Sequence, residues 1–122
     1  MKTLLFSISL VLFAGFGGVA CKSNKAAKNT SNEYRLIVSF LSKGGGIDMK
    51  IHEEFLSFID KHSKKPRYES YRWGREGEID YCFQLGEMKV KEQSEFIENV
   101  KTMIGKSDEV QVLENSPCVH KK

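Results

Sequence analysis

The sequence lacks an apolar run long enough to cross a membrane. Its longest run, residues 4–16, has 13 residues, whereas a spanning helix needs about 20. The sequence also lacks the His-x-x-x-His and Cys-x-x-Cys spacings that are typical of metal sites. It has no internal repeat, and no low-complexity stretch apart from residues 22–32. These absences argue against a membrane-spanning helix, a Cys/His metal module and a repeat array, and leave a short chain with room for one core.

The formal charge of the chain is +3, but this excess lies outside the region that can form a core. Four of the 19 basic residues precede residue 34, whereas residues 34–122 contain 15 basic and 15 acidic residues. A domain without net charge lacks the strongly basic balance that is typical of proteins that bind nucleic acid. We therefore predict no nucleic-acid partner.

Residues 1–21 have the pattern of an export signal. Lys2 precedes the apolar run, and Gly18-Val19-Ala20-Cys21 follows it, which is the arrangement of a signal peptide. These last four residues resemble the lipobox of bacterial lipoproteins, although Gly18 stands where such signals usually have Leu or Val. The resemblance implies that residues 1–20 are removed by signal peptidase II and that Cys21 becomes lipidated, with palmitate among its acyl chains. The alternative is an ordinary secretory signal that happens to contain a cysteine.

Residues 22–32 consist of small and polar side chains, which cannot bury enough surface to fold. We predict that residues 21–33 form the lipidated cysteine and a flexible tether, and that residues 34–122 form one α+β domain with a C-terminal tail. Surface-exported lipoproteins of the Bacteroidota often carry acidic residues after the cysteine, whereas this chain carries lysines there. That comparison implies a lipid-anchored protein of the cell envelope that faces the periplasm.

The domain is predicted to contain four strands and two helices. Residues 34–41 are rich in β-branched and aromatic side chains on both faces, which indicates a buried central strand. Asp48 can cap the first helix, Pro66 ends it, and Gly105 can end the second. The predicted elements are a strand at 34–41, a helix from 48 to about 64, hairpin strands at 67–74 and 78–85, a helix from about 90 to 105, and a strand at 109–114.

This β-α-β-β-α-β order is similar to the ferredoxin-like fold. The resemblance implies an antiparallel sheet of strand order 4-1-3-2, with both helices on one face and the other face open. Such a face needs a covering, which the C-terminal tail, a second copy or another protein could supply. We predict that this open face is the binding surface. Its residues are Ile37, Ser39, Asp80, Cys82, Gln84, Gln111 and Leu113.

Cys82 and Cys118 remain as an even pair if Cys21 is lipidated, and an exported protein lies in an oxidising compartment. In the implied sheet, the strand of Cys82 and the last strand flank the first strand, about 9–10 Å apart. A disulfide needs Cα atoms within about 7 Å. The tail would therefore have to fold back across the open face to bring Cys118 to Cys82. The alternative is two free thiols.

Two weaker patterns point to small ligands. Lys43 and the glycines Gly44, Gly45 and Gly46 lead from a strand into a helix, where backbone N–H groups favour anions. The alternative is a flexible turn, because the glycines lack the spacing of a phosphate-binding loop. The side chains of Glu76, Glu78 and Asp80 share one strand face and could converge on a hard cation, or they could form a solvated hairpin edge. His52 is expected to face solvent, and His62 to close the apolar stripe of the first helix.

Together these patterns favour a membrane-anchored lipoprotein that carries a small binding or interaction domain. Its predicted partners are the membrane, through the anchor, and another protein or a second copy, through the open sheet face. The alternatives are a periplasmic carrier of a metal ion or small anion, and a small hydrolase with Asp80 or Glu78 as base. No cofactor is predicted. The string WGREGEIDYC at residues 73–82 also resembles small Bacteroidota lipoproteins, with which we associate no activity.

Overall fold

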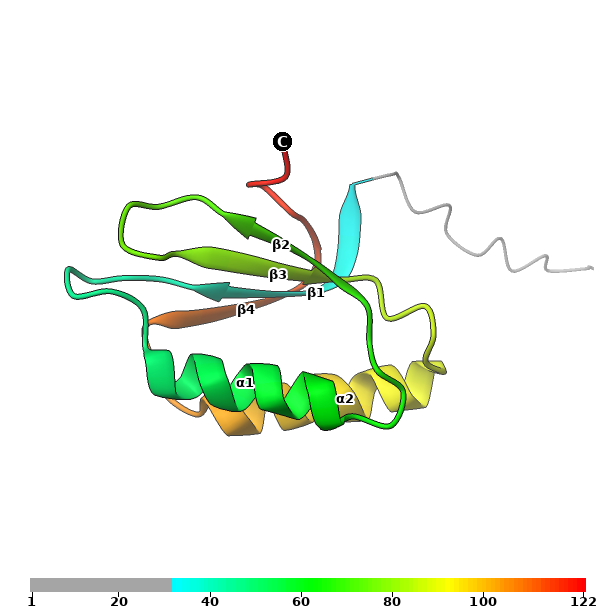
Figure 1. Cartoon of the computed structure of the whole chain (residues 1–122). Helices are drawn as coiled ribbons and strands as arrows, with labels where there is room; N and C mark the ends of the chain where they lie inside the picture. The colour runs from blue at the N-terminus through cyan, green and yellow to red at the C-terminus, as the bar shows by residue number, and fades with distance from the viewer. Residues whose placement is uncertain (1–31) are drawn as a thin grey trace, which may run out of the picture.

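The computed structural model describes residues 32–122, which form a four-stranded antiparallel sheet and two helices (Figure 1). Residues 1–31, with the predicted signal peptide, Cys21 and most of the tether, lie outside the described residues. The elements are β1 (Glu33–Phe40), α1 (Met49–Lys61), β2 (Tyr68–Arg72), β3 (Ile79–Phe83), α2 (Val90–Ile104) and β4 (Val110–Pro117). The α+β class and the order of the elements are confirmed.

The strands lie in the order β2-β3-β1-β4, and each neighbouring pair is antiparallel. β1 has a central position because its side chains are apolar on both faces, and only a central strand with both faces covered can bury them all. Leu36, Val38 and Phe40 pack in the main core, whereas Ile37 packs in a second, smaller cluster. The prediction of a central first strand is therefore confirmed.

The two helices begin and end where local chemistry places their caps. The Asp48 carboxylate accepts a hydrogen bond from the backbone N–H of Ile51 at 3.1 Å at the start of α1. At the start of α2, the Glu92 carboxylate accepts from the backbone N–H of Lys89 at 2.8 Å. Gly105 ends α2 with a φ of 62°, a conformation that glycine adopts without steric strain.

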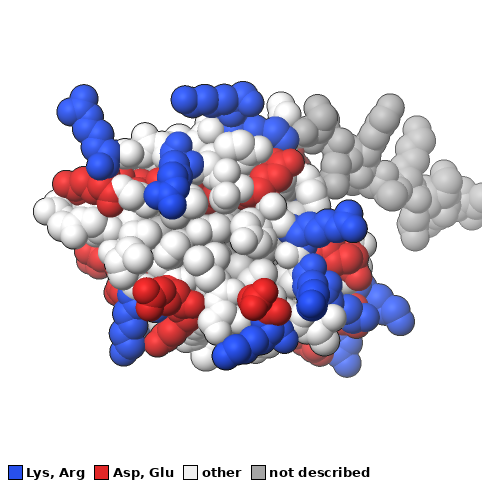
Figure 2. Space-filling view, viewed as in Figure 1, with Lys and Arg blue, Asp and Glu red and all other residues white. Residues whose placement is uncertain are grey.

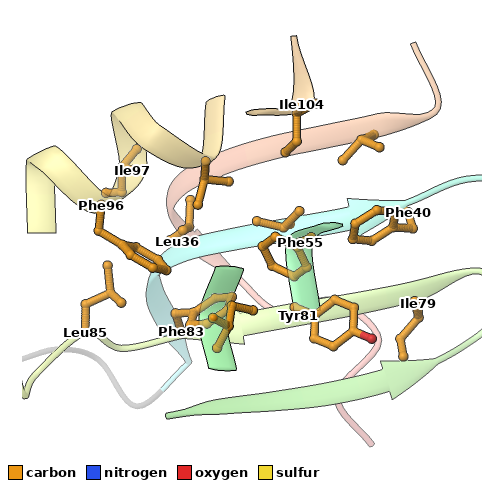
Figure 3. Close-up of a cluster of buried hydrophobic side chains, with 14 of the residues drawn as sticks. Leu36, Phe40, Phe55, Ile79, Tyr81, Phe83, Leu85, Phe96, Ile97 and Ile104 are labelled. Atoms are coloured by element: carbon orange, nitrogen blue, oxygen red, sulfur yellow. The ribbon is translucent and has the colours of Figure 1, made fainter. Parts of the chain in front are cut away.

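Both helices lie along one face of the sheet, and the main core fills the space between (Figures 1 and 3). Phe55 of α1 lies 5.5 Å from Phe40 and 6.1 Å from Phe83, measured between ring centroids. Phe96 of α2 lies 5.9 Å from Phe83. His62 packs edge-on against Phe96 at 5.2 Å, so its predicted place at the end of the apolar stripe is confirmed.

The strand boundaries differ from the prediction at both edges of the sheet. β4 continues to Pro117 rather than ending at 114, because its backbone stays paired with the start of β1, where Glu33 opposes Pro117. The two hairpin strands are shorter than predicted at both ends, because the turn between them occupies residues 73–78 and their pairing stops where Tyr68 lies opposite Phe83.

Both buried clusters lie within residues 34–118. Residues 32–122 therefore contain the whole of their own core, and we expect them to fold without the preceding segment. Within these residues, no helix has the length and hydropathy that crossing a membrane requires.

Candidate functional site

Residues 118–122 pack on the sheet face opposite the helices, and we call this face, together with the tail residues on it, the tail face. The prediction of an open face here was wrong for four of its seven residues. Ile37, Ser39, Asp80 and Cys82 are only 2%, 7%, 1% and 1% exposed. They cannot serve as a binding surface, because the tail turns back over the sheet after Pro117 and takes the place that a ligand would need.

A disulfide holds the tail on the sheet. Cys82 and Cys118 are bonded with an S–S distance of 2.01 Å, and their Cα atoms lie 6.3 Å apart, within the range a disulfide allows. The bonded pair packs with Tyr34 and Ile37, and Tyr71 lies against this cluster. The disulfide pairing is thus present in the structure, and the tail supplies the covering that the mixed sheet face requires.

Asp80 is the centre of a polar cluster on the tail face that the sequence did not predict. Its buried carboxylate accepts a hydrogen bond from Trp73 Nε1 at 2.9 Å and contacts His120 Nδ1 at 2.5 Å. The rings of Trp73 and His120 are stacked, with centroids 4.3 Å apart and planes 9° apart. These contacts satisfy a carboxylate whose burial would otherwise be very unfavourable. His120 is 40 residues from Asp80 in the sequence, so only the disulfide-held tail brings them together.

A second polar cluster surrounds Glu69 at the edge of the tail face. Its carboxylate accepts hydrogen bonds from Tyr34 Oη at 2.5 Å, Tyr71 Oη at 2.7 Å and Lys121 Nζ at 3.1 Å. Lys121 also donates to Tyr34 Oη at 2.8 Å. These donors, Tyr34 first, then Tyr71 and Lys121, lower the pKa of the Glu69 carboxyl to about 2 from its ordinary 4.5. The same cluster raises the pKa of Lys121 and of Tyr71. Glu69 and Lys121 are therefore an ion pair at neutral pH.

The exposed part of the tail face is an apolar rim around these clusters. Leu113 is 37% exposed and Trp73 is 39% exposed, and Val119 of the tail is 72% exposed. Gln84 and Gln111 are also exposed. Three of the predicted surface residues, Gln84, Gln111 and Leu113, are therefore accessible. Trp73 falls within the strand predicted at 67–74 but lies in the turn after β2, and Val119 belongs to a tail without a periodic pattern, so neither was predicted to be part of this surface.

The glycine turn offers no open cradle for an anion. The Ser42 hydroxyl accepts hydrogen bonds from the backbone N–H groups of Gly44 and Gly46, at 3.1 Å and 3.0 Å. The same hydroxyl donates to the Glu76 carboxylate. Two of the amides that would bind an anion already have a partner, and a negative charge lies beside them. Gly45 is an exposed part of the same turn. These contacts favour the alternative interpretation, in which residues 43–46 form a turn and not an anion site.

The three carboxylates of the hairpin do not converge on one point. Glu76 contacts Ser42, Glu78 accepts from the backbone N–H of Glu76 at 2.9 Å, and Asp80 contacts Trp73 and His120. No group of three or more His, Cys, Asp or Glu side chains within residues 32–122 could hold a metal ion. Of the two readings of this strip, these contacts do not favour the cation site, because two of the carboxylates serve local turn contacts and the third is enclosed by the tail.

His52 is half-buried rather than facing solvent, which corrects the expectation from the sequence. Its Nε2 lies 2.7 Å from the Tyr81 hydroxyl, and its ring packs edge-on against Phe40 at 4.9 Å. Burial, followed by the positive charge of Arg72, lowers the pKa of the imidazole. The neutral ring therefore acts as a packing residue between α1 and the sheet.

The geometry of the tail face can support binding, and it also holds one imidazole in a fixed orientation. The Asp80 carboxylate accepts a hydrogen bond from Nδ1 of His120, and within residues 32–122 the Nε2 atom of His120 forms no hydrogen bond. A carboxylate in this position is the usual means of holding a histidine that accepts a proton at Nε2. Comparison of the chain with protein-family models, with curated proteins and with solved structures gave no match.

Proposed function

We propose that this protein is a membrane-anchored lipoprotein of the cell envelope whose domain binds another protein, or a second copy of itself, through the tail face. The anchor is Cys21, and the domain faces the periplasm. We further propose that the domain belongs to the ferredoxin-like group. The strand order β2-β3-β1-β4 supports this, because it is the order 4-1-3-2 read from the opposite edge.

The observation that carries the binding proposal is the exposed apolar rim of Trp73, Leu113 and Val119, beside a tail that the disulfide ties to the sheet. Large exposed apolar side chains on a pre-organised surface are typical of protein interfaces, where tryptophan is enriched. Within residues 32–122, every buried side-chain nitrogen or oxygen has a hydrogen-bond partner, so the binding of a partner protein would not require new bonds to buried groups.

The anchor is tested by the mass of the mature protein. We expect the membrane fraction of cells that express the full chain to contain a species that begins at Cys21 and carries acyl chains. Cys21→Ser should remain unprocessed or lose the acylated form. A mature N-terminus at any other residue, with no added acyl mass, would contradict the lipoprotein assignment.

The binding surface is tested by crosslinking in the intact envelope. A photo-reactive residue at position 119 should give a specific crosslinked product, whereas one at Met49 should not. Met49 is a matched control because it is an apolar residue 56% exposed, but it lies on α1 across the sheet from the tail face. Equal crosslinking at both positions, or none at 119, would refute the tail face as the interface.

The Asp80–His120 contact favours one second candidate, a small hydrolase with His120 as the base. No serine, threonine or cysteine side chain within residues 32–122 forms a hydrogen bond with His120, so water would be the nucleophile. Hydrolysis of ester or amide probes by residues 32–122, abolished in His120→Gln, is the result this candidate requires. Equal rates for wild type and His120→Gln would eliminate it.

A further inference from the structure

The neutral domain is polarised along its length. At the end where β1 begins, the α1–β2 and β3–α2 connections carry four cations, Lys64, Lys65, Arg67 and Lys89, and one carboxylate, Glu87. The opposite end has three connections, at residues 41–48, 73–78 and 105–109, and carboxylates outnumber cations there, so we call it the acidic end. Its cations are Lys43, Arg75 and Lys106, and its carboxylates are Asp48, Glu76, Glu78, Asp108 and Glu109.

The cations at the first end form one surface. Lys64, Lys65 and Arg67 of one connection line a surface hollow with Gly86 and Glu87 of the other. Figure 2 shows Lys and Arg side chains on this end of the domain, at the right of the view. We call Lys64, Lys65, Arg67 and Lys89 the basic end.

Two carboxylates, Glu87 and Glu92, offset part of this positive charge. Lys64 pairs with Glu92 at 3.4 Å, and Glu87 accepts from the backbone N–H of Arg67 at 2.8 Å. Within residues 32–122, Lys65, Arg67 and Lys89 form no ion pair, and the sequence before residue 32 contains no Asp or Glu.

The basic end lies beside the start of the domain. Gln84 of the β3–α2 connection donates a hydrogen bond to the backbone carbonyl of Glu33, the first residue of β1, at 3.2 Å. Eleven residues separate Cys21 from Glu33. As a random coil, a segment of this length spans roughly 17–20 Å. With Cys21 in the bilayer, the basic end would be the part of the domain nearest the membrane.

We propose that the basic end binds the anionic headgroups of the membrane to which the protein is anchored, and so sets the orientation of the domain. This inference rests on the proposed lipid anchor. Each Lys or Arg near an anionic surface strengthens binding by roughly fivefold. With the basic end on the membrane, the acidic end would face away, and the tail face would stand at the side of the domain, open to a partner.

The test is sedimentation of residues 32–122, without the lipid, on vesicles. We expect binding to phosphatidylcholine vesicles with about one-third phosphatidylglycerol, little binding to pure phosphatidylcholine, and release as salt shortens the screening length. The double variant Lys65→Gln/Arg67→Gln should bind roughly 25-fold more weakly, since it lacks two cations. Lys89→Gln should weaken binding roughly fivefold.

The matched control is Lys50→Gln/Lys106→Gln, which removes the same charge at the opposite end. Lys50 follows the first residue of α1 and Lys106 follows Gly105. The eight-residue β1 separates the two ends by roughly 25 Å, about three screening lengths at physiological salt. The control should therefore bind as wild type does.

Three results would overturn the proposal: equal losses in the two double variants, equal binding to neutral vesicles, or full release by millimolar inorganic phosphate, which would indicate a small-anion site. The vesicle result is independent of acylation. If residues 32–122 bind anionic vesicles but Cys21 of the full chain carries no acyl group, the lipid anchor is refuted and the basic end is not. If Cys21 is acylated but residues 32–122 do not bind anionic vesicles, the basic end is refuted and the anchor is not.

Discussion

Removing the Cys82–Cys118 bond is the perturbation with the most direct consequence for the tail face. The bond closes a loop of 36 residues. On the chain-entropy treatment, this closure removes about 13 cal/mol/K from the unfolded chain, which is about 4 kcal/mol at 25 °C. Small domains have total stabilities of about 5–15 kcal/mol. The reduced protein should therefore be marginally stable.

The assay is urea unfolding of residues 32–122, followed by far-ultraviolet circular dichroism. For a domain of this size, the free energy changes by roughly 2 kcal/mol per molar urea. The midpoint of the reduced wild type should therefore fall by about 2 M relative to the oxidised protein. Cys82→Ser/Cys118→Ser should match the reduced wild type, apart from the small effect of two buried hydroxyls.

Tail release has its own signal, because Trp73 is the single tryptophan of the chain and stacks on His120. Reduction should change the tryptophan emission at urea concentrations where the circular dichroism is still that of the folded state. A free-energy difference below about 1 kcal/mol, with unchanged emission, would refute the view that the disulfide is what holds the tail on the sheet.

Three further results are expected from the same domain. Asp80→Asn should lower the free energy of unfolding by about 1–3 kcal/mol, because it replaces a buried carboxylate that holds Trp73 and His120, and urea midpoints measure the loss. Glu69 has a folded-state pKa of about 2 against an ordinary 4.5, so its stabilising effect is present above pH 4.5 and is lost as the pH falls towards 2. Melting temperatures from pH 6 to 2 should therefore fall more steeply for wild type than for Glu69→Gln, and parallel curves would contradict the cluster. Phe55→Ala should destabilise by about 3–5 kcal/mol, because Phe55 contacts the rings of both central strands, and a loss below 1 kcal/mol would contradict the packing shown in Figure 3.

Predictions from local patterns succeeded where the physical cause is itself local. The apolar run of β1, the cap at Asp48 and the stop at Gly105 each depend on a few consecutive residues. The ends of β4 and of the hairpin strands were less accurate, because strand length depends on how far the partner strand continues. Pro117 is in a strand only because Glu33 lies opposite.

Predictions about the site failed where distant residues meet. The sequence placed Asp80 on a face with Ile37 and Ser39, which is correct, but it could not show that His120 would lie on Asp80 or that Lys121 would lie on Glu69. Five tail residues carry no periodic pattern. One signal was available, the pairing of Cys82 with Cys118, because His120 and Lys121 follow Cys118 by only two and three residues.

The sequence by itself determined the elements of this protein, its neutral domain, its pair of cysteines and the export pattern that ends at Cys21, because each depends on composition or on neighbouring residues. Only the tertiary structure decided which surfaces are available. The return of the tail buries Ile37, Ser39 and Asp80, exposes Val119 and brings His120 to Trp73, and the topology gathers Lys65, Arg67 and Lys89 at the end where the domain begins. Long-range contacts of this kind depend on the closure of the whole chain around its core, which no local pattern encodes.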